Sequence, residues 1–227
     1  MCGIAGIVNL RGNPVEPAEI SRLTSLIAHR GPFGEGTWFN AKRNVAFGHR
    51  RLAIIDPGEG GYQPMVSGDG RHVIVYNGEI YNFLELRREL EAKGAVFRSQ
   101  SDTEVILAAW QAWGEDMLLR FNGMWALAIY DTATDELFLA RDRFGIKPML
   151  YALSSERFVF ASEQRALARS GLLETSLDID VARRLLLDPF GIEGSERTLY
   201  SQVRRLQGGH CMWLRQGRVQ VRRWWRT

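Results

Sequence analysis

The second residue of the chain, Cys2, is the residue best suited to covalent chemistry. It follows Met1, and the enzymes that remove an initiator methionine accept a small second side chain. Removal of Met1 would give Cys2 a free α-amine, so that one residue would carry a thiol nucleophile and an amine base. The amine titrates near pH ~8 and a free thiol near pH ~8.5, so both exchange protons at physiological pH. The alternative is a small buried cysteine at the start of a strand, and these residues alone do not decide between the two.

The element that would position Cys2 is a short buried strand over residues 4–8, in which small residues allow close backbone approach. Beyond it, hydrophobic periodicity and turn residues predict further strands and helices. The predicted strands cover 37–39, 45–49, 72–76, 124–130, 136–140, 149–153, 158–161 and a final hairpin around Gly217, and the strand character of 45–49 is expected to continue through 50–56. The predicted helices begin at Pro17 and after the caps Asn82, Ser101, Ser162 and Asp178. Antiparallel hairpins with interspersed helices indicate an α+β fold and not a doubly wound parallel sheet.

The composition is that of a globular domain. The chain has 227 residues, 45% of them hydrophobic, which is enough for a sizeable core in one domain. It has no apolar stretch of ~18 residues and no signal peptide, so we expect no membrane span and a cytoplasmic protein. The two cysteines, Cys2 and Cys211, argue against a disulfide framework and fit a reducing compartment.

Charge and histidine spacing exclude two further classes of site. The net charge is +3, and the paired arginines are spread along the chain without a basic block, so we expect no nucleic-acid binding. The four histidines have no metal-ligand spacing among themselves or with the cysteines, so we expect no metal. His49, which lies beside Arg50 and Arg51, is interpreted as structural and not catalytic.

A series of motifs spans most of the chain. They are MCGIAGI at 1–7, HRGP at 29–32, GHRRLAIID at 48–56, YQPM at 62–65, YNGEIYN at 76–82, SDTE at 101–104, ARDRFGIKP at 140–148 and FASE at 160–163. In this order they resemble the glutaminase domain of glutamine-hydrolysing asparagine synthetases, which are class II glutamine amidotransferases of the N-terminal-nucleophile hydrolase superfamily. The resemblance implies a four-layer αββα sandwich of two mainly antiparallel sheets, with Cys2 at the end of an inner strand.

The resemblance also implies a site that hydrolyses the side-chain amide of glutamine through a γ-glutamyl thioester on Cys2. Asn77 and the backbone N–H of Gly78 would hold the oxyanion, because a neutral amide donor and a closely approaching backbone suit that task. Taken alone, Asn77-Gly78 also favours a tight turn.

The head of the substrate needs charged partners. Arg51 matches the position that binds the α-carboxylate, while Arg50 is interpreted as a solvated surface charge. Asp102 and Glu79 match the positions that bind the α-ammonium. Asp102 would also favour the first turn of a helix, and Glu79 could be an exposed turn carboxylate.

The resemblance implies one glutaminase domain over 2–227 that supplies ammonia to an ATP-dependent amidation. The phosphate loop Ser-Gly-Gly-x-Asp-Ser of the synthetase half is absent from this chain, so ATP and Mg²⁺ are expected only in a separate synthetase domain or subunit. No cofactor is expected in the glutaminase domain itself. A face that docks such a partner should be unusually apolar, and a homodimer is left open.

One departure from the family favours a rival function. Phe33 stands where the family normally has Asp, and it would alter loop closure or weaken the positioning of Arg30. The rival is a structural or regulatory domain that has kept the fold and lost hydrolysis. Such domains usually lose the N-terminal cysteine, whereas Cys2 is present here.

Overall fold

The computed structural model describes residues 1–56, 58–192 and 194–226, so Thr227 at the end of the expected domain lies outside them. Within these residues, twelve strands form two six-stranded sheets in which every strand pair is antiparallel. The first sheet has the order β10 (Arg204–Arg205), β8 (Leu150–Leu153), β9 (Arg157–Ala161), β1 (Gly3–Asn9), β3 (Val45–Arg50) and β2 (Glu35–Phe39). The second has the order β12 (Arg218–Arg223), β11 (His210–Arg215), β7 (Glu136–Arg141), β6 (Gly123–Asp131), β5 (His72–Ile80) and β4 (Met65–Val66).

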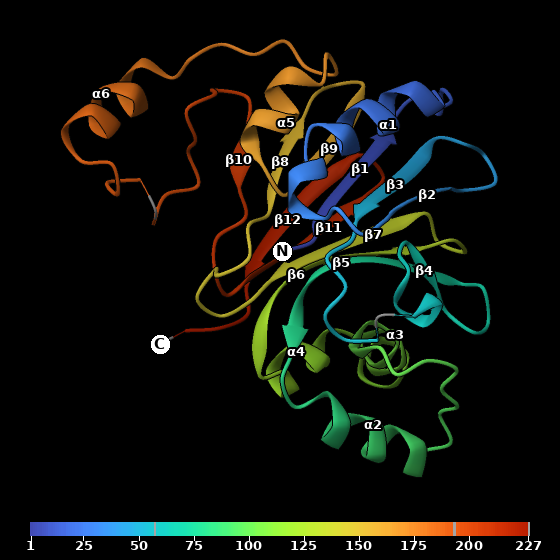
Figure 1. Cartoon of the computed structure of the whole chain (residues 1–227). Helices are drawn as coiled ribbons and strands as arrows, with labels where there is room; N and C mark the ends of the chain where they lie inside the picture. Colours follow the sequence, from blue (N-terminus) through green and yellow to red (C-terminus); the bar gives the residue numbers. More distant parts are fainter. Residues whose placement is uncertain (57, 193, 227) are drawn as a thin grey trace.

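Helices cover the outer face of each sheet (Figure 1). Those on the first sheet are α1 (Pro17–Ser25) and α5 (Gln164–Arg169). Those on the second are α2 (Phe83–Ala92), α3 (Asp102–Trp113) and α4 (Met117–Arg120). Short 3₁₀ turns lie at Ala28–Arg30, Glu59–Gly61 and Gly114–Asp116. The predicted α+β class and four-layer αββα sandwich are confirmed.

Three hydrophobic clusters hold the four layers together. One lies between the sheets, and each of the other two lies between a sheet and its helices. Strand alternation explains this division. In β1, Ile4 joins the cluster between the sheets, while its neighbour Ala5 joins the cluster under α1. Position 6 requires glycine, because a Cβ there would lie 2.1 Å from the ring of Phe160.

The strand that carries Asn77 and Gly78 is longer than predicted. It was expected to end at Tyr76, but β5 continues to Ile80 because Asn77 and Gly78 pair with β6. The two residues therefore form part of a ladder and not a tight turn. Glycine is required at 78 because a Cβ would lie 2.4 Å from the carbonyl oxygen of Met124.

The strand character predicted beyond β3 is wrong. The strand ends at Arg50, and residues 52–56 form no strand. Arg51 still pairs with the loop before β2, because its backbone N–H donates to Gly34 O at 2.8 Å and it forms an isolated bridge with Pro32.

Two of the predicted helix caps are confirmed. The hydroxyl of Ser101 accepts from Thr103 N at 3.1 Å, and the carboxylate of Asp178 accepts from Val181 N at 3.2 Å. Asn82 occupies the N-cap position of α2, but its side chain contacts Arg120 O and Asn122 N instead of the helix.

Ser162 does not cap α5. Its hydroxyl accepts from the backbone N–H of Ile4 at 3.0 Å, and Glu163 takes the N-cap position. The Ser162 hydroxyl therefore fixes β1 at Ile4, two residues after Cys2.

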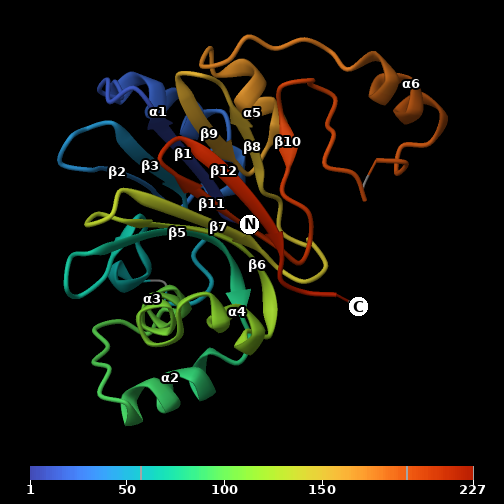
Figure 2. The ribbon, with the colours of Figure 1, turned by 180° about the vertical axis from the view of Figure 1, so that it is seen from behind.

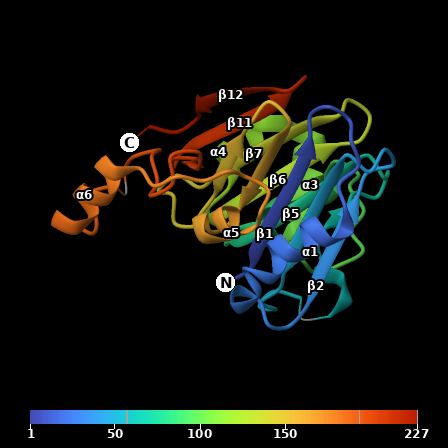
Figure 3. The same ribbon diagram turned by 90° about the horizontal axis from the view of Figure 1, so that it is seen from above.

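Helix α6 (Ile179–Leu187) stands away from the layers, on the same side of the molecule as the C-terminus in all three views (Figures 1, 2 and 3). Val181 is the residue that it buries. Leu186 and Leu187 are 87% and 89% exposed, and Phe190 follows them into solvent.

Candidate active site

A pocket lies at the start of β1, where Met1 and Cys2 line it. Figure 1 marks the N-terminus at this end of β1. The pocket contains about 530 Å³ of empty space, counting its open mouth. The six residues that the sequence singles out all line it: Cys2, Arg51, Asn77, Gly78, Glu79 and Asp102. They come from β1, β3, β5 and α3 and the segments that adjoin them, so the fold brings together residues far apart in sequence.

Cys2 immediately precedes β1, and its thiol faces the backbone of Leu52. The Sγ atom lies 3.4 Å from Leu52 N and 3.5 Å from Leu52 O. The Cys2 carbonyl accepts from Arg30 Nε at 3.0 Å, and Arg30 is held in turn by Glu163 at 3.1 Å. Burial raises the pKa of the Cys2 thiol, while the contact with the Leu52 backbone opposes that shift. The thiol is therefore fixed in place and needs a neighbouring base.

The α-amine at this end of the chain belongs to Met1, which also lines the pocket. Burial is the main cause that lowers the pKa of this amine. The charge of Cys2 opposes the shift, and the charges of Arg30 and Lys147 add to it. In this form the nitrogen of Cys2 lies in a peptide bond and cannot serve as a base.

Asn77 brings an amide donor that has no partner in the described part of the chain. Its side chain is 1% exposed, and Nδ2 makes no hydrogen bond. A buried amide without a partner costs roughly 1–3 kcal/mol. Such a cost is typical of a group kept free for a ligand, and Nδ2 belongs to a residue that lines the same pocket as the Cys2 thiol.

Arg51 is buried and Arg50 is not part of the pocket. Arg51 Nη1 donates to Gly58 O at 2.8 Å, Nη2 donates to Asp56 O, and the guanidinium carbon lies 4.7 Å from the centre of the Tyr62 ring. A guanidinium has five N–H donors, so these two bonds leave others for a ligand.

The interpretation of Arg50 as a solvated charge is wrong. Arg50 pairs with Glu35 at 2.6 Å, and its Nε donates to Thr24 O at 3.3 Å. Because adjacent residues point to opposite sides of an extended backbone, only one of the two arginines can enter the pocket.

Two carboxylates, those of Asp102 and Glu79, also line the pocket. Asp102, the first residue of α3, accepts from the Tyr76 hydroxyl at 2.8 Å and from Ile80 N at 3.1 Å. Burial nevertheless raises the pKa of Asp102, and the negative charge of Glu79 adds to the shift. A cation bound between Asp102 and Glu79 would relieve this unfavourable charge.

Two residues of the pocket, Tyr76 and Lys147, were not predicted from the sequence to belong to a site, and His49 was predicted to be structural. Tyr76 positions Asp102, and Lys147 contributes a buried cation. His49 was interpreted as structural, and burial lowers its pKa to about 3, so it stays neutral. The contact of His49 with the Tyr76 backbone opposes this pKa shift but is weaker than the effect of burial. The one sequence signal for Lys147 is its place in the motif at 140–148.

Phe33 projects into solvent and is 65% exposed. Its backbone N–H donates to Arg51 O at 3.1 Å, so the loop still adjoins the pocket. Arg30 is positioned by Glu163 and by the carbonyl of Cys2, without an acid at position 33.

The described ranges hold no group of three or more His, Cys, Asp or Glu residues arranged to bind a metal ion. No helix in them is long and apolar enough to cross a membrane.

Comparison with known proteins extends these observations. The family model described as "Glutamine amidotransferase domain" matches residues 1–225. Asparagine synthetase [glutamine-hydrolyzing] 3 of Bacillus subtilis is 36% identical over 99% of this chain and 36% of its own length. A putative asparagine synthetase [glutamine-hydrolyzing] of Mycobacterium bovis is 40% identical over 92% of this chain and 34% of its own length. The chain thus spans about a third of these relatives.

Solved structures share the fold. Glutamine phosphoribosylpyrophosphate amidotransferase from Bacillus subtilis superimposes with a TM-score of 0.74 at 20% identity, covering 100% of this chain and 50% of that one. At this identity the likeness shows the fold alone. The family match over residues 1–225 shows that the chain belongs to the glutamine amidotransferase domain family.

Proposed function

We propose that this domain hydrolyses the side-chain amide of glutamine to glutamate and ammonia through a thioester on Cys2. One observation carries the proposal: the Cys2 thiol and the unpartnered Asn77 amide lie in one pocket with a buried guanidinium and two carboxylates. Amide hydrolysis needs a nucleophile, an oxyanion donor and a grip on the substrate, and these residues supply all three kinds of group.

In the proposed reaction, the α-amine of a processed Cys2 accepts the thiol proton, and the sulfur attacks the amide carbon of glutamine. Asn77 Nδ2 and the backbone N–H of Gly78 donate to the oxyanion that forms. The amine then passes its proton to the leaving nitrogen, and ammonia departs. Water attacks the thioester, with the amine again as base, and releases glutamate with Cys2 restored.

The proposed grip on glutamine uses charge at both ends of its amino-acid head. The free donors of Arg51 bind the α-carboxylate, since a guanidinium matches a carboxylate with two parallel bonds. Asp102 and Glu79 bind the α-ammonium, which offsets the repulsion between them. Tyr76 fixes the orientation of Asp102 during binding.

Removal of Met1 is part of the proposal. It frees the α-amine of Cys2, and it also clears space, because Met1 lines the pocket that glutamine would enter. The unprocessed chain should therefore be inactive for two independent reasons.

The ammonia would serve an ATP-dependent amidation of the kind that the relatives' names indicate, with ATP and Mg²⁺ bound by a separate synthetase domain or subunit. An apolar docking face is expected for such a partner, and the exposed Leu186, Leu187 and Phe190 around α6 offer one.

The test is to measure glutamate and ammonia formed from glutamine by the processed protein, with Cys2→Ala as the control. We expect the two products in equal amounts and a loss of both, by at least about 10³-fold, in the variant. Fully processed protein that forms neither product would contradict the proposal and favour a structural or regulatory role.

A further inference from the structure

Lys147 is a largely buried lysine whose side chain lines the Cys2 pocket. It is 5% exposed and lines the same pocket as Cys2. Within the described residues, its ammonium makes no ion pair or hydrogen bond. It is also one of only three lysines among the 29 basic residues of the chain. Its Nζ is not among the fully buried side-chain atoms that lack a partner, so the ammonium reaches the open pocket that also holds the Cys2 thiol.

The backbone of Lys147, and not its side chain, holds the loop in place. Lys147 N donates to the Asp142 carboxylate at 3.0 Å, and Lys147 O accepts from Arg141 Nε at 2.6 Å. Arg141 also donates to Leu206 O at 2.7 Å and to Gly145 O. These contacts involve only the backbone of Lys147. The loop therefore fixes the position of the residue and does not engage its ammonium.

The charges around the Cys2 end of the pocket are mixed. Arg30 and Arg51 are positive and already hydrogen-bonded, Arg30 to Cys2 and Glu163 and Arg51 to the 56–58 segment. Glu79 and Asp102 are the acids of the pocket, and its His49 and Tyr76 are neutral near pH 7, because burial lowers the pKa of His49 to about 3 and raises that of Tyr76 well above its usual value. Among the cations of this pocket in the described residues, Lys147 is thus the one whose ammonium makes no hydrogen bond or ion pair.

We propose that Lys147 is a positioning residue of the reaction at Cys2, whose ammonium favours the neutral amine and the thiolate over their protonated forms. The inference rests on the proposed function, because it assigns a role in that same reaction. A nearby positive charge disfavours protonation of both groups, so its effect on the amine and on the thiol has the same sign. The charge of Lys147 already contributes to the lowered pKa of the Met1 amine, after burial and Arg30.

The test is the rate at which iodoacetamide alkylates Cys2 as a function of pH, read by peptide mass in the full chain. In Lys147→Met we expect the midpoint of this profile to move up by about 1 pH unit, so that alkylation below it is about tenfold slower. Lys147→Arg, which keeps the charge, should restore the midpoint. Iodoacetamide needs no glutamine pocket, so this readout stands even where glutamine hydrolysis fails.

The chain offers two matched controls. Lys93→Met makes the same substitution at an exposed lysine and should leave the midpoint unchanged. Cys211, whose pKa burial raises to about 11, reports on any general change in the fold and should alkylate equally slowly in every variant.

A profile that keeps its midpoint in Lys147→Met while the rate falls at every pH would overturn the inference and assign the side chain a structural role. If thermal unfolding shows that Lys147→Met does not fold, Lys147→Gln provides another neutral side chain at this position for the same measurement. The pH profile of glutamine hydrolysis should move in the same direction as that of alkylation.

Discussion

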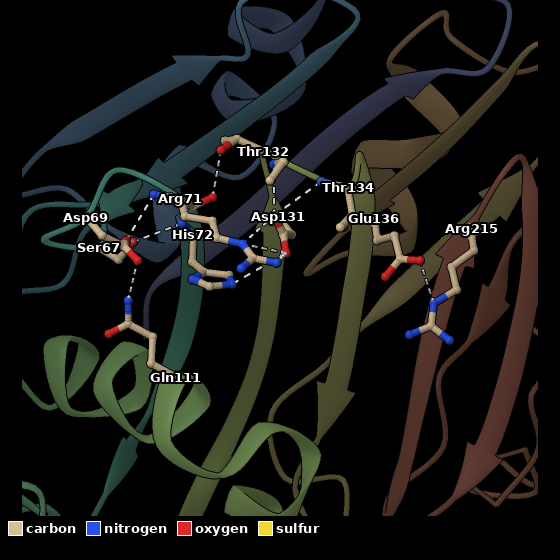
Figure 4. A network of polar contacts seen from close by, with 11 residues as sticks. Ser67, Asp69, Arg71, His72, Gln111, Asp131, Thr132, Thr134, Glu136 and Arg215 are labelled. Carbon is tan, nitrogen blue, oxygen red and sulfur yellow. Dashed lines mark hydrogen bonds and ion pairs between the residues drawn. The ribbon is translucent and has the colours of Figure 1, made fainter. Parts of the chain in front are cut away.

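The Cys2 pocket and the network around Asp131 are both rich in charged residues, and they use them in opposite ways. In the network, near the turn between β6 and β7, Asp131 accepts from Arg71 Nη2 at 2.7 Å and from Ala133 N at 2.8 Å (Figure 4). Burial opposes the shift, but these bonds lower the pKa of Asp131 to about 2. In the pocket, burial raises the pKa of Asp102 instead.

The difference lies in where the polar groups find partners. Asp69 accepts from Arg71 N and from Gln111, and Glu136 pairs with Arg215 at 3.1 Å (Figure 4). One ring nitrogen of His72 is the exception, since it has no partner in the described residues. In the described part of the chain, the pocket leaves Asn77 Nδ2 without a hydrogen-bond partner. A network that satisfies itself stabilises the fold, whereas one that leaves donors free can bind something else.

The largest effect that would separate the two regions is on Asn77. In Asn77→Ala we expect kcat for glutamine hydrolysis to fall by about 10²–10³, because an oxyanion donor acts in the transition state. The KM should change little. Steady-state kinetics with thermal unfolding as the fold control tests this, and a variant with unchanged kcat would remove Asn77 from the reaction.

Arg51→Lys should have the next largest effect. Lysine keeps the charge but cannot offer the parallel pair of donors, so we expect kcat/KM to fall by roughly 10–100-fold, mainly through KM. Arg50→Lys is the matched control and should leave kinetics within about twofold, since Arg50 pairs outside the pocket. Equal losses in both variants would mean that Arg51 does not contact the substrate.

Phe33→Asp should have a smaller effect and the opposite sign. An acid in this loop restores a charge and a hydrogen-bond acceptor beside the pocket, and we expect glutaminase activity to rise by a few-fold. The measurement is kcat/KM for Phe33→Asp and for the unaltered protein. No change, or a decrease, would show that the aromatic side chain does not weaken the site.

Asp131→Asn should affect stability and not activity. The folded pKa of about 2 lies below the unfolded value of ~3.9, so the charged carboxylate stabilises the fold above pH ~4, and this contribution is lost as the pH falls through about 2. We expect a loss of under about 1 kcal/mol at pH 7, because the site is partly solvated. Urea unfolding at pH 7 and pH 2 measures it. A loss of glutaminase activity larger than twofold would show that the Asp131 network also affects the Cys2 pocket.

Local sequence patterns predicted most of the strands and helices. The positions of the motifs predicted which residues line the pocket. Alternation located β1 and the hairpins, and both the Ser101 and Asp178 caps hold. Ser162 and Asn82 could not be assigned from local sequence, because their side chains bond to Ile4 and to residues 120–122, which only the tertiary fold brings near.

The strand through Asn77 and Gly78 was missed for a similar reason. The dipeptide favours a turn by itself, and pairing with β6 overrides that preference. Lys147 was missed because its burial depends on bonds made by Arg141 and Asp142.

The most direct test of the central claim, that Cys2 is the nucleophile of a glutamine pocket, is the intact mass of the expressed protein before and after treatment with 6-diazo-5-oxo-norleucine. We expect loss of Met1, followed by a single adduct that maps to Cys2 and forms more slowly in the presence of glutamine. A processed protein whose Cys2 stays unlabelled, while iodoacetamide alkylates it, would contradict the claim.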